Sequence, residues 1–198
     1  MDNQIIAVNL QNLGYAVHFF ETGAEAADYL EVEVKGKTVG FGGSITAKEL
    51  GLYERLQKEN HTVWHWVDGA GKEIRNEATR AQVYITSANA IAETGEIVNI
   101  DGTGNRLAAT LYGPEVVYII VGRNKLCGDY DSALYRARNV AAPLNAKRLN
   151  RKTPCTVDLK CHDCKSADRI CHGLAVLWRP MEGVGRTEVL IVNEDLGM

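Results

Sequence analysis

Short apolar runs alternate along the chain with segments whose apolar positions recur at helical spacing. The runs at Thr38–Phe41, Val83–Thr86 and Val116–Val121 have the length of strands. The last run is apolar throughout, as in a strand that is covered on both faces. Helical spacing is found over Lys72–Ala81 and Asp131–Ala142. This alternation predicts an α/β fold with a largely parallel sheet.

Further elements are expected in the rest of the chain. They are helices at Ile5–Leu13 and Gly23–Leu30, and strands at Ala16–Glu21, Thr62–Val67, Glu96–Ile100, Leu174–Trp178 and Glu188–Val192. The segment from Thr46 to Glu49 has the pattern of a capping box, which would begin a helix at Thr46. Pro143 is expected to end the helix that precedes it. We predict one domain over residues 1–198, with a cysteine-bearing insertion at about residues 150–172.

Composition and charge narrow the functional classes. The chain has 198 residues, of which 45% are hydrophobic and 24% charged, as in a packed globular protein. Its net charge of −3 gives no general attraction for nucleic acid. Its apolar runs fall short of the roughly 20 residues that span a bilayer, and its first residues lack the features of a signal peptide. We therefore expect a cytoplasmic protein that binds neither nucleic acid nor membrane.

Four of the five cysteines are clustered in the pattern C-x5-C-x2-C-x6-C. They are Cys155, Cys161, Cys164 and Cys171. Thiolates bind soft or borderline metals, and a C-x2-C pair lets two sulfurs bind one centre. A zinc site usually has two such pairs, whereas a single pair with wider flanking spacing suits an iron–sulfur cluster. We expect a 4Fe–4S cluster, and zinc or metal-free thiols are the alternatives.

The two histidines near this pattern have two interpretations each. His162 and His172 would either replace a cysteine ligand or lie in solvated loops. Cys127 follows the most apolar strand, and we expect an inert thiol at the edge of the core. The basic run from Lys147 to Lys152 is expected to form a solvated face or to flank the cluster.

Polar and glycine-rich segments follow several predicted strands, where ligands collect in parallel sheets. Backbone N–H groups in such turns would hold a phosphate or carboxylate, although many tight turns hold nothing. The candidate ligand-binding residues in these segments are Gly42, Gly43, Ser44, Thr94, Gly95, Asn105, Arg123, Asn124 and Lys125.

Two charged residues in the segment Ser87–Arg106 are candidate catalytic groups. Arg106 would hold an anion through two hydrogen bonds. Glu93 would act as a nucleophile or a base. The alternative is a turn-rich hairpin.

Upstream, Trp64 and Trp66 alternate along a predicted strand, so we expect them to share one face and to pack in the core.

Long segments of the chain resemble the LUD (lactate-utilisation) domain family. They are GFGGSITAKELGL, ITSANAIAETGEIVNIDGTGNRLAA, VVYIIVGRNK, RNVAAPLNAKRL and CHDCKSADRIC. The resemblance extends from about Ala16 to Leu196, and the chain looks like a stand-alone member of the cysteine-bearing subgroup. It implies a three-layer α/β/α domain with a mostly parallel, Rossmann-like sheet, similar to ribose-5-phosphate isomerase and the CoA transferases.

The resemblance also assigns roles to residues. Gly42, Gly43 and Ser44 match the family's first glycine loop. Glu93, Thr94 and Gly95 match an acidic-glycine turn, and Asn105 and Arg106 match its GNR motif. It implies an iron–sulfur protein, either an oxidoreductase component or an enzyme, that serves the oxidation of lactate or a related small hydroxy acid.

The implied partners are a small anionic substrate, redox partner subunits and, in a homodimer, a second copy of the chain. Two other functions stay open. One is a clusterless enzyme that acts on a sugar phosphate or acyl thioester through Glu93. The other is a non-catalytic ligand-binding or assembly subunit with a structural zinc.

Overall fold

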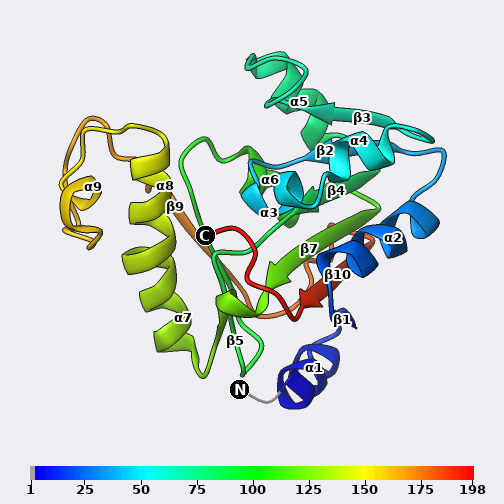
Figure 1. Cartoon of the computed structure of the whole chain (residues 1–198), viewed down its shortest axis with the longest axis horizontal. Coiled ribbons are helices and arrows are strands. Elements are labelled where there is room, and N and C mark those ends of the chain that lie inside the picture. The colour runs from blue at the N-terminus through cyan, green and yellow to red at the C-terminus, as the bar shows by residue number, and fades with distance from the viewer. Residues whose placement is uncertain (1–2) are drawn as a thin grey trace.

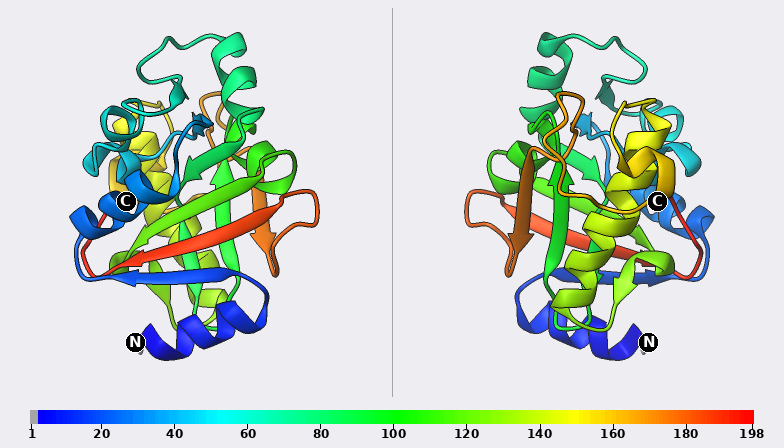
Figure 2. Two further views of the ribbon diagram at one scale, coloured as in Figure 1. Left: turned by 90° about the vertical axis from the view of Figure 1, so that its right-hand side faces the viewer. Right: turned by 90° about the vertical axis from the view of Figure 1, so that its left-hand side faces the viewer.

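A six-stranded parallel sheet forms the centre of the computed structural model, which describes residues 3–198. The strand order is β1-β10-β7-β4-β2-β3 (Figure 1), and both views of Figure 2 show β10 between β1 and β7. The strands are β1 (Ala16–Phe20), β2 (Thr38–Phe41), β3 (His61–Trp64), β4 (Val83–Thr86), β7 (Val116–Gly122) and β10 (Arg186–Val192). The predicted α/β class is confirmed. Residues 1 and 2 of the predicted domain lie outside the described residues.

Helices cover both faces of this sheet and make a three-layer arrangement. One face carries α2 (Gly23–Glu33), α3 (Ile45–Glu49) and α4 (Leu52–Leu56), and the other carries α1 (Asn3–Asn12), α5 (Lys72–Thr79) and α6 (Asn105–Leu111). Along β7, Tyr118 and Ile120 pack into the first core, while Val117, Ile119 and Val121 pack into the second. This alternation follows from the two-residue repeat of a strand and explains why β7 is apolar throughout.

A second, smaller sheet lies against the second core. Its strand order is β8-β5-β6-β9, with β6 antiparallel to both neighbours. The strands are β5 (Ala90–Ala92), β6 (Ile97–Asp101), β8 (Leu126–Cys127) and β9 (Gly173–Leu177). Strands were predicted at the positions of β6 and β9, but the sequence did not separate them from the main sheet. Short apolar runs look alike whichever sheet they join.

The second sheet is covered by one long helix, at the left of Figure 1. This helix comprises α7 (Tyr130–Arg136), a π-helical segment Ala137–Ala141 and α8 (Ala142–Arg148). The prediction that Pro143 ends the helix is therefore wrong. Proline lacks an N–H and is tolerated in a first helical turn, and the wider π-helical turn supplies such a position. The N–H of Ala142 accordingly donates to the carbonyl of Ala137.

The helix start predicted at Thr46 is also wrong. Ser44 caps α3, and its hydroxyl accepts a hydrogen bond from the N–H of Ala47 at 3.1 Å. Thr46 instead lies buried inside the helix. A complete capping box is found at α2, where the hydroxyl of Thr22 accepts from the N–H of Glu25 at 3.2 Å. Both segments contain the required residue types, so local pattern alone does not decide between them.

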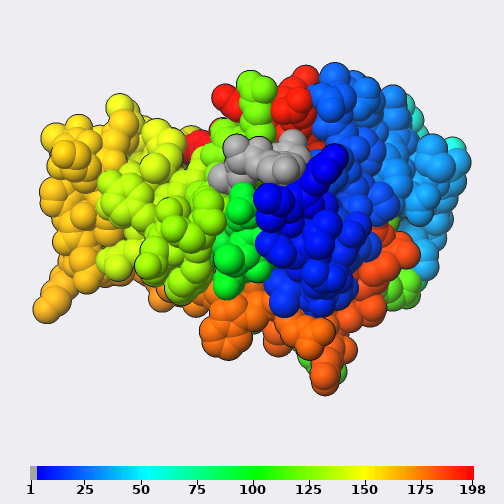
Figure 3. All heavy atoms as spheres, turned by 90° about the horizontal axis from the view of Figure 1, so that it is seen from below, coloured from blue at the N-terminus to red at the C-terminus, as the bar shows by residue number. Residues whose placement is uncertain are grey.

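The cysteine-bearing segment after α8 lies beside the long helix, outside the central layers. It is mostly loop and includes the short helix α9 (Cys155–Asp158). In Figure 3 its yellow and orange atoms form the left-hand end of the molecule. Among residues 3–198, none of the helices combines the length and the apolar character that crossing a membrane requires.

Candidate functional site

Two neighbouring cavities lie beside the long helix α7–α8. The first, called the cysteine cavity below, has a volume of about 360 Å³ and is lined by all four clustered cysteines. The second, the polar cavity, has a volume of about 430 Å³ and lies at the carboxyl ends of the main strands. Residues that line both cavities form a common wall, namely Ile100, Ala142, Arg169, Ile170 and His172.

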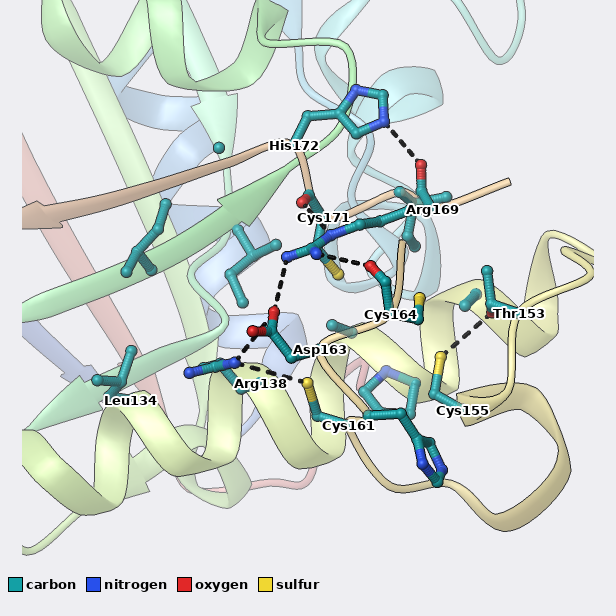
Figure 4. Close-up of a pocket in the computed structure, with 18 residues that line it drawn as sticks. Leu134, Arg138, Thr153, Cys155, Cys161, Asp163, Cys164, Arg169, Cys171 and His172 are labelled. Carbon is teal, nitrogen blue, oxygen red and sulfur yellow. Dashed lines mark hydrogen bonds and ion pairs between the residues drawn. The ribbon is translucent and has the colours of Figure 1, made fainter. Parts of the chain in front are cut away.

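In the cysteine cavity, two of the cysteines contact neighbouring polar side chains (Figure 4). Cys155 begins α9, and the hydroxyl of Thr153 lies 3.2 Å from its sulfur. The N–H of Cys161 donates to the side-chain oxygen of Asn139 at 3.3 Å. The guanidinium of Arg138 donates to the sulfur of Cys161 at 3.9 Å. The π-helical segment thus holds the loop that carries Cys161.

Arg169 holds the other two cysteines through their backbones. Its guanidinium donates to the carbonyl of Cys164 at 2.8 Å and to the carbonyl of Cys171 at 2.9 Å. It also lies 3.3 Å from the carboxylate of Asp163, which Arg138 approaches to 3.5 Å. Two cations therefore lie at the cysteine cavity and share one carboxylate.

The four thiols are close enough to influence one another. Burial raises the pKa of the Cys171 thiol, the other three clustered cysteines raise it further, and only Arg169 lowers it. A set of thiolates in such a cavity needs positive charge to be stable, which a metal centre supplies.

The four cysteines line one cavity, but their side chains are not gathered around a common point. Among the described residues, no group of three or more His, Cys, Asp or Glu side chains is suited to hold one ion. The two flanking histidines have other partners. His162 lies 2.9 Å from the carboxylate of Asp158, and a ring nitrogen of His172 donates to the carbonyl of Arg169 at 2.7 Å. Four cysteines that line one cavity are the ligand types of an iron–sulfur cluster and of a zinc site alike.

The polar cavity carries an excess of positive charge. Its lining has six basic side chains and one carboxylate, namely Arg75, Arg106, Lys125, Arg148, Arg151 and Arg169, with Asp101. A cavity lined by charges of mainly one sign attracts a ligand of the opposite sign. It is therefore suited to a small anion.

Arg106 is fixed in this cavity by contacts on one side of its guanidinium. It follows Gly104, which has a left-handed backbone at the start of α6. Its Nη2 donates to the carbonyl of Ile100 at 2.5 Å, and its Nε lies 3.9 Å from Asp101. A guanidinium has five N–H groups, so an anion can still be bound by the others.

Two polar atoms of the cavity lining are buried without a partner. They are the side-chain nitrogen of Asn105 and the Nδ1 atom of His65, neither of which has a hydrogen-bond partner within residues 3–198. Burial lowers the pKa of His65, and the charge of Arg75 lowers it further, so the ring is neutral near neutral pH. Buried polar groups are normally paired, so both atoms are candidates for contact with a ligand.

Strand β3 ends at Trp64, three residues before the predicted end, and this exposes the next residues to the polar cavity. The chain turns, and the N–H of Val67 donates to the carbonyl of Trp64 at 2.9 Å. Trp64 packs in the first core as expected and stacks on Trp66 with ring centroids 5.0 Å apart. Trp66 itself lies beyond the strand, is only partly buried and lines the polar cavity. The guanidinium of Arg148 lies 5.1 Å from the centre of the Trp66 ring, in a cation–π contact.

Lys125 lies in the single helical turn Arg123–Lys125 that follows β7, and it is buried, with 4% of the residue exposed. Its amine donates to the hydroxyls of Thr46 at 2.9 Å and Ser87 at 2.8 Å. Burial lowers the pKa of Lys125 to about 7, and the nearby charges of Arg136 and Arg106 act in the same direction. The predicted ligand-binding residue is thus a largely desolvated amine that lines the polar cavity.

The predicted glycine loop contributes two of its three residues. Gly43 and Ser44 line the polar cavity. The N–H of Gly42 donates to the carbonyl of Ile85 at 3.0 Å, so it is not free to hold an anion. A Cβ at Gly42 would lie 3.2 Å from the hydroxyl of Tyr84 and 3.3 Å from the Cγ of Arg106. The glycine therefore allows close packing beneath the cavity.

Glu93, Thr94 and Gly95 lie apart from these residues. They form the turn between β5 and β6, against α1, and within the described chain they line neither cavity. The side chain of Asn9 donates to the carbonyl of Glu93 at 2.7 Å. A Cβ at Gly95, whose φ is +105°, would lie 2.4 Å from the side chain of Leu13. Glu93, predicted with Arg106 as a candidate catalytic group, therefore lies outside the cavity that Arg106 lines.

Arg123 and Asn124 also line neither cavity among the described residues. Arg123 forms an exposed ion pair with Asp195 at 3.0 Å. The side chain of Asn124 accepts from the N–H of Leu196 at 3.1 Å. Both residues hold the C-terminal segment in place.

Comparisons with known proteins give one family and one fold. A family model described as LUD domain matches residues 4–192. The structure is similar to the crystal structure of a DUF162 family protein from Deinococcus radiodurans, with a TM-score of 0.57 and 13% sequence identity over 96% of this chain and 94% of that chain. No curated protein matches the chain.

Proposed function

The chain belongs to the LUD domain family, which is linked to lactate utilisation, and from that premise we propose that it is an iron–sulfur protein that binds lactate or a related small hydroxy acid beside its cluster. One observation carries the proposal. A cavity lined by four cysteines and a cavity lined by six basic residues share a wall. A metal centre and an anionic substrate would thus be bound next to each other.

The ligands of the proposed 4Fe–4S cluster are Cys155, Cys161, Cys164 and Cys171. Thiolates are the usual ligands of such clusters. Arg138 and Arg169 would stabilise the negative charge of the thiolates, and Arg169 also fixes the loop through two carbonyls. When bound, the cluster would supply one-electron transfer between the substrate side and a redox partner.

The polar cavity supplies groups for each end of a 2-hydroxy acid. Arg106 and Arg148 would bind the carboxylate, because guanidinium groups match its two oxygens. The side-chain nitrogen of Asn105 would donate to the substrate. His65 is neutral near neutral pH, so its ring is suited to accept the proton of the hydroxyl.

The alternatives receive less support from this geometry. A structural zinc would use the same four cysteines, and their single C-x2-C pair is less typical of zinc than of an iron–sulfur cluster. A clusterless enzyme that uses Glu93 needs this carboxylate in a cavity, whereas it lies in a turn against α1. A cytoplasmic location and redox partner subunits belong to the proposal.

The test is metal content after purification without oxygen. We expect about four irons and four acid-labile sulfides per chain. Replacement of any one of the four clustered cysteines by serine is expected to lower both values. Cys127→Ala is the matched control, since this cysteine lies in the core beneath α7 and not in the cysteine cavity. About one zinc per chain, or iron that survives all four replacements, would refute the cluster.

A further inference from the structure

We propose that Lys125 forms an imine with a small 2-oxo acid held in the polar cavity. The inference rests on the anion-binding part of the proposed function, and it does not depend on the cluster. It assigns to this lysine a covalent role, in addition to the ligand binding expected of it.

The surroundings of Lys125 favour a nucleophile over a structural cation. Its hydrogen-bond partners are the hydroxyls of Thr46 and Ser87, and none of the ion pairs found among residues 3–198 includes this amine. A buried ammonium would normally have a carboxylate partner. Two hydroxyls are sufficient for a neutral amine and leave its lone pair available.

The charged groups around the amine act mostly against its protonation. Arg136 from α7 and Arg106 from α6 repel a positive charge, and the carboxylate of Glu49 from α3 attracts one. Glu49 is also engaged elsewhere, since it accepts from the N–H of Gly197 at 2.7 Å. About half of the Lys125 amine is therefore neutral near pH 7, compared with less than about one in a thousand for an exposed lysine.

The step itself is a condensation. The lone pair of the amine attacks the carbonyl carbon of the 2-oxo acid, and a carbon–nitrogen bond forms. The carbonyl oxygen leaves as water with two protons from the amine nitrogen, and the carbon–nitrogen double bond remains. No electrons are gained or lost, so no oxidant or reductant is needed. The imine withdraws electrons from the former carbonyl carbon and so weakens the bonds next to that carbon.

The acid must carry a carboxylate, because the cavity that Lys125 lines is cationic. Arg106 lines the same cavity and keeps N–H groups that its backbone contact does not use. A carbonyl compound without a carboxylate would lose these contacts. The predicted ligand class is therefore a 2-oxo acid, and a cavity of about 430 Å³ has ample room for a small one such as pyruvate.

The test uses pyruvate as the probe and cyanoborohydride to reduce the imine to a stable amine. The intact protein is incubated with both near neutral pH, and the adduct is located by mass spectrometry of its peptides. Labelling of Lys125 is expected to be about tenfold faster, or more, than labelling of any exposed lysine. Acetone, which lacks the carboxylate, is expected to label it far more slowly.

Three variants make the test specific. Lys125→Met removes the amine and is expected to abolish the adduct. Lys147→Met is the control, because this exposed lysine near the end of α8 lines neither cavity, and it is expected to leave the adduct unchanged. Arg106→Gln keeps the amine and is expected to raise the half-saturating pyruvate concentration by about tenfold or more.

Two outcomes would overturn the inference. One is labelling spread evenly over surface lysines, and the other is an unchanged adduct yield in folded Lys125→Met. Lactate binding measured by calorimetry separates this result from the proposed function. If lactate binds and no adduct forms at Lys125, the imine is refuted and the anion site stands. If the adduct forms and the protein lacks iron, the imine stands and the cluster is refuted.

Discussion

Lys125→Met is expected to stabilise the protein, and to do so most at low pH. In the unfolded chain this lysine has its ordinary pKa of 10.5, and burial lowers the pKa to about 7 in the folded protein. At pH values between these two pKa values the unfolded state binds more protons than the folded state, so the stability of the wild type rises with pH across this window. Methionine has a similar shape and does not titrate.

The magnitude follows from the difference between the two pKa values. The fall in pKa costs the wild type about 5 kcal/mol at about pH 6, because a tenfold change in an equilibrium is about 1.4 kcal/mol. The same cost is about 1 kcal/mol at about pH 9.5. Loss of the hydrogen bonds to Thr46 and Ser87 offsets the gain by about 1 kcal/mol each at either pH. The stability advantage of the variant therefore shrinks by about 3 to 4 kcal/mol between the two conditions.

The assay is urea unfolding of wild type and Lys125→Met at both pH values, followed by circular dichroism. Lys147→Met serves as the control, and the difference between this variant and the wild type is expected to be independent of pH, since this side chain is exposed. An advantage of Lys125→Met that is equal at the two pH values would refute a lowered pKa for Lys125. A variant that is less stable than the wild type at about pH 6 would refute the desolvated amine itself.

Three further substitutions test the packing and the polar cavity. In urea unfolding, Gly40→Ala is expected to lower the unfolding free energy by about 3 kcal/mol or more, because the new Cβ would lie 2.0 Å from a carbonyl of α5. Gly128→Ala is the control: a Cβ there meets open space, so we expect a change of less than about 0.5 kcal/mol. Glu188→Gln replaces a carboxylate that is 1% exposed and is bound by an arginine, a histidine and a tyrosine. We expect the unfolding free energy to fall by about 1 to 3 kcal/mol, and Glu54→Gln, at an exposed position, is the control. Arg148→Gln is expected to weaken lactate binding by about tenfold or more in calorimetry, and an unchanged affinity would remove this guanidinium from the anion site.

The main sheet could be predicted from the sequence because each of its strands has a local signature. Val116–Val121 is apolar throughout, and the strand β7 that it forms is covered on both faces. Helix ends were less predictable. A proline at position 143 would normally end a regular α-helix. Here a π-helical segment precedes Pro143 and lets the helix continue, and that segment depends on how the long helix packs against the second sheet. Tertiary packing of this kind has no signal in the local sequence.

The candidate site was predictable only in part. Lys125 follows β7 of the parallel sheet, where ligands are expected, and Arg106 lies in the glycine-rich segment after β6; both line the polar cavity. Glu93 lies in an equally polar segment, but it is at the turn of a hairpin whose other end faces the cavity. Arg75 and Arg148 come from helices far away in the sequence. The only available signal for Arg148 was the basic run around it, and such runs are usually solvated.

The measurement that tests the central claim most directly is the electron paramagnetic resonance spectrum of the reduced, anaerobically purified protein with and without lactate. If the two cavities act as one site, lactate at saturation will change the cluster spectrum of the wild type, and Arg106→Gln will need about tenfold or more lactate for the same change. A cluster spectrum that stays the same while calorimetry shows full lactate binding would contradict the account. So would the absence of any cluster signal in protein that binds lactate.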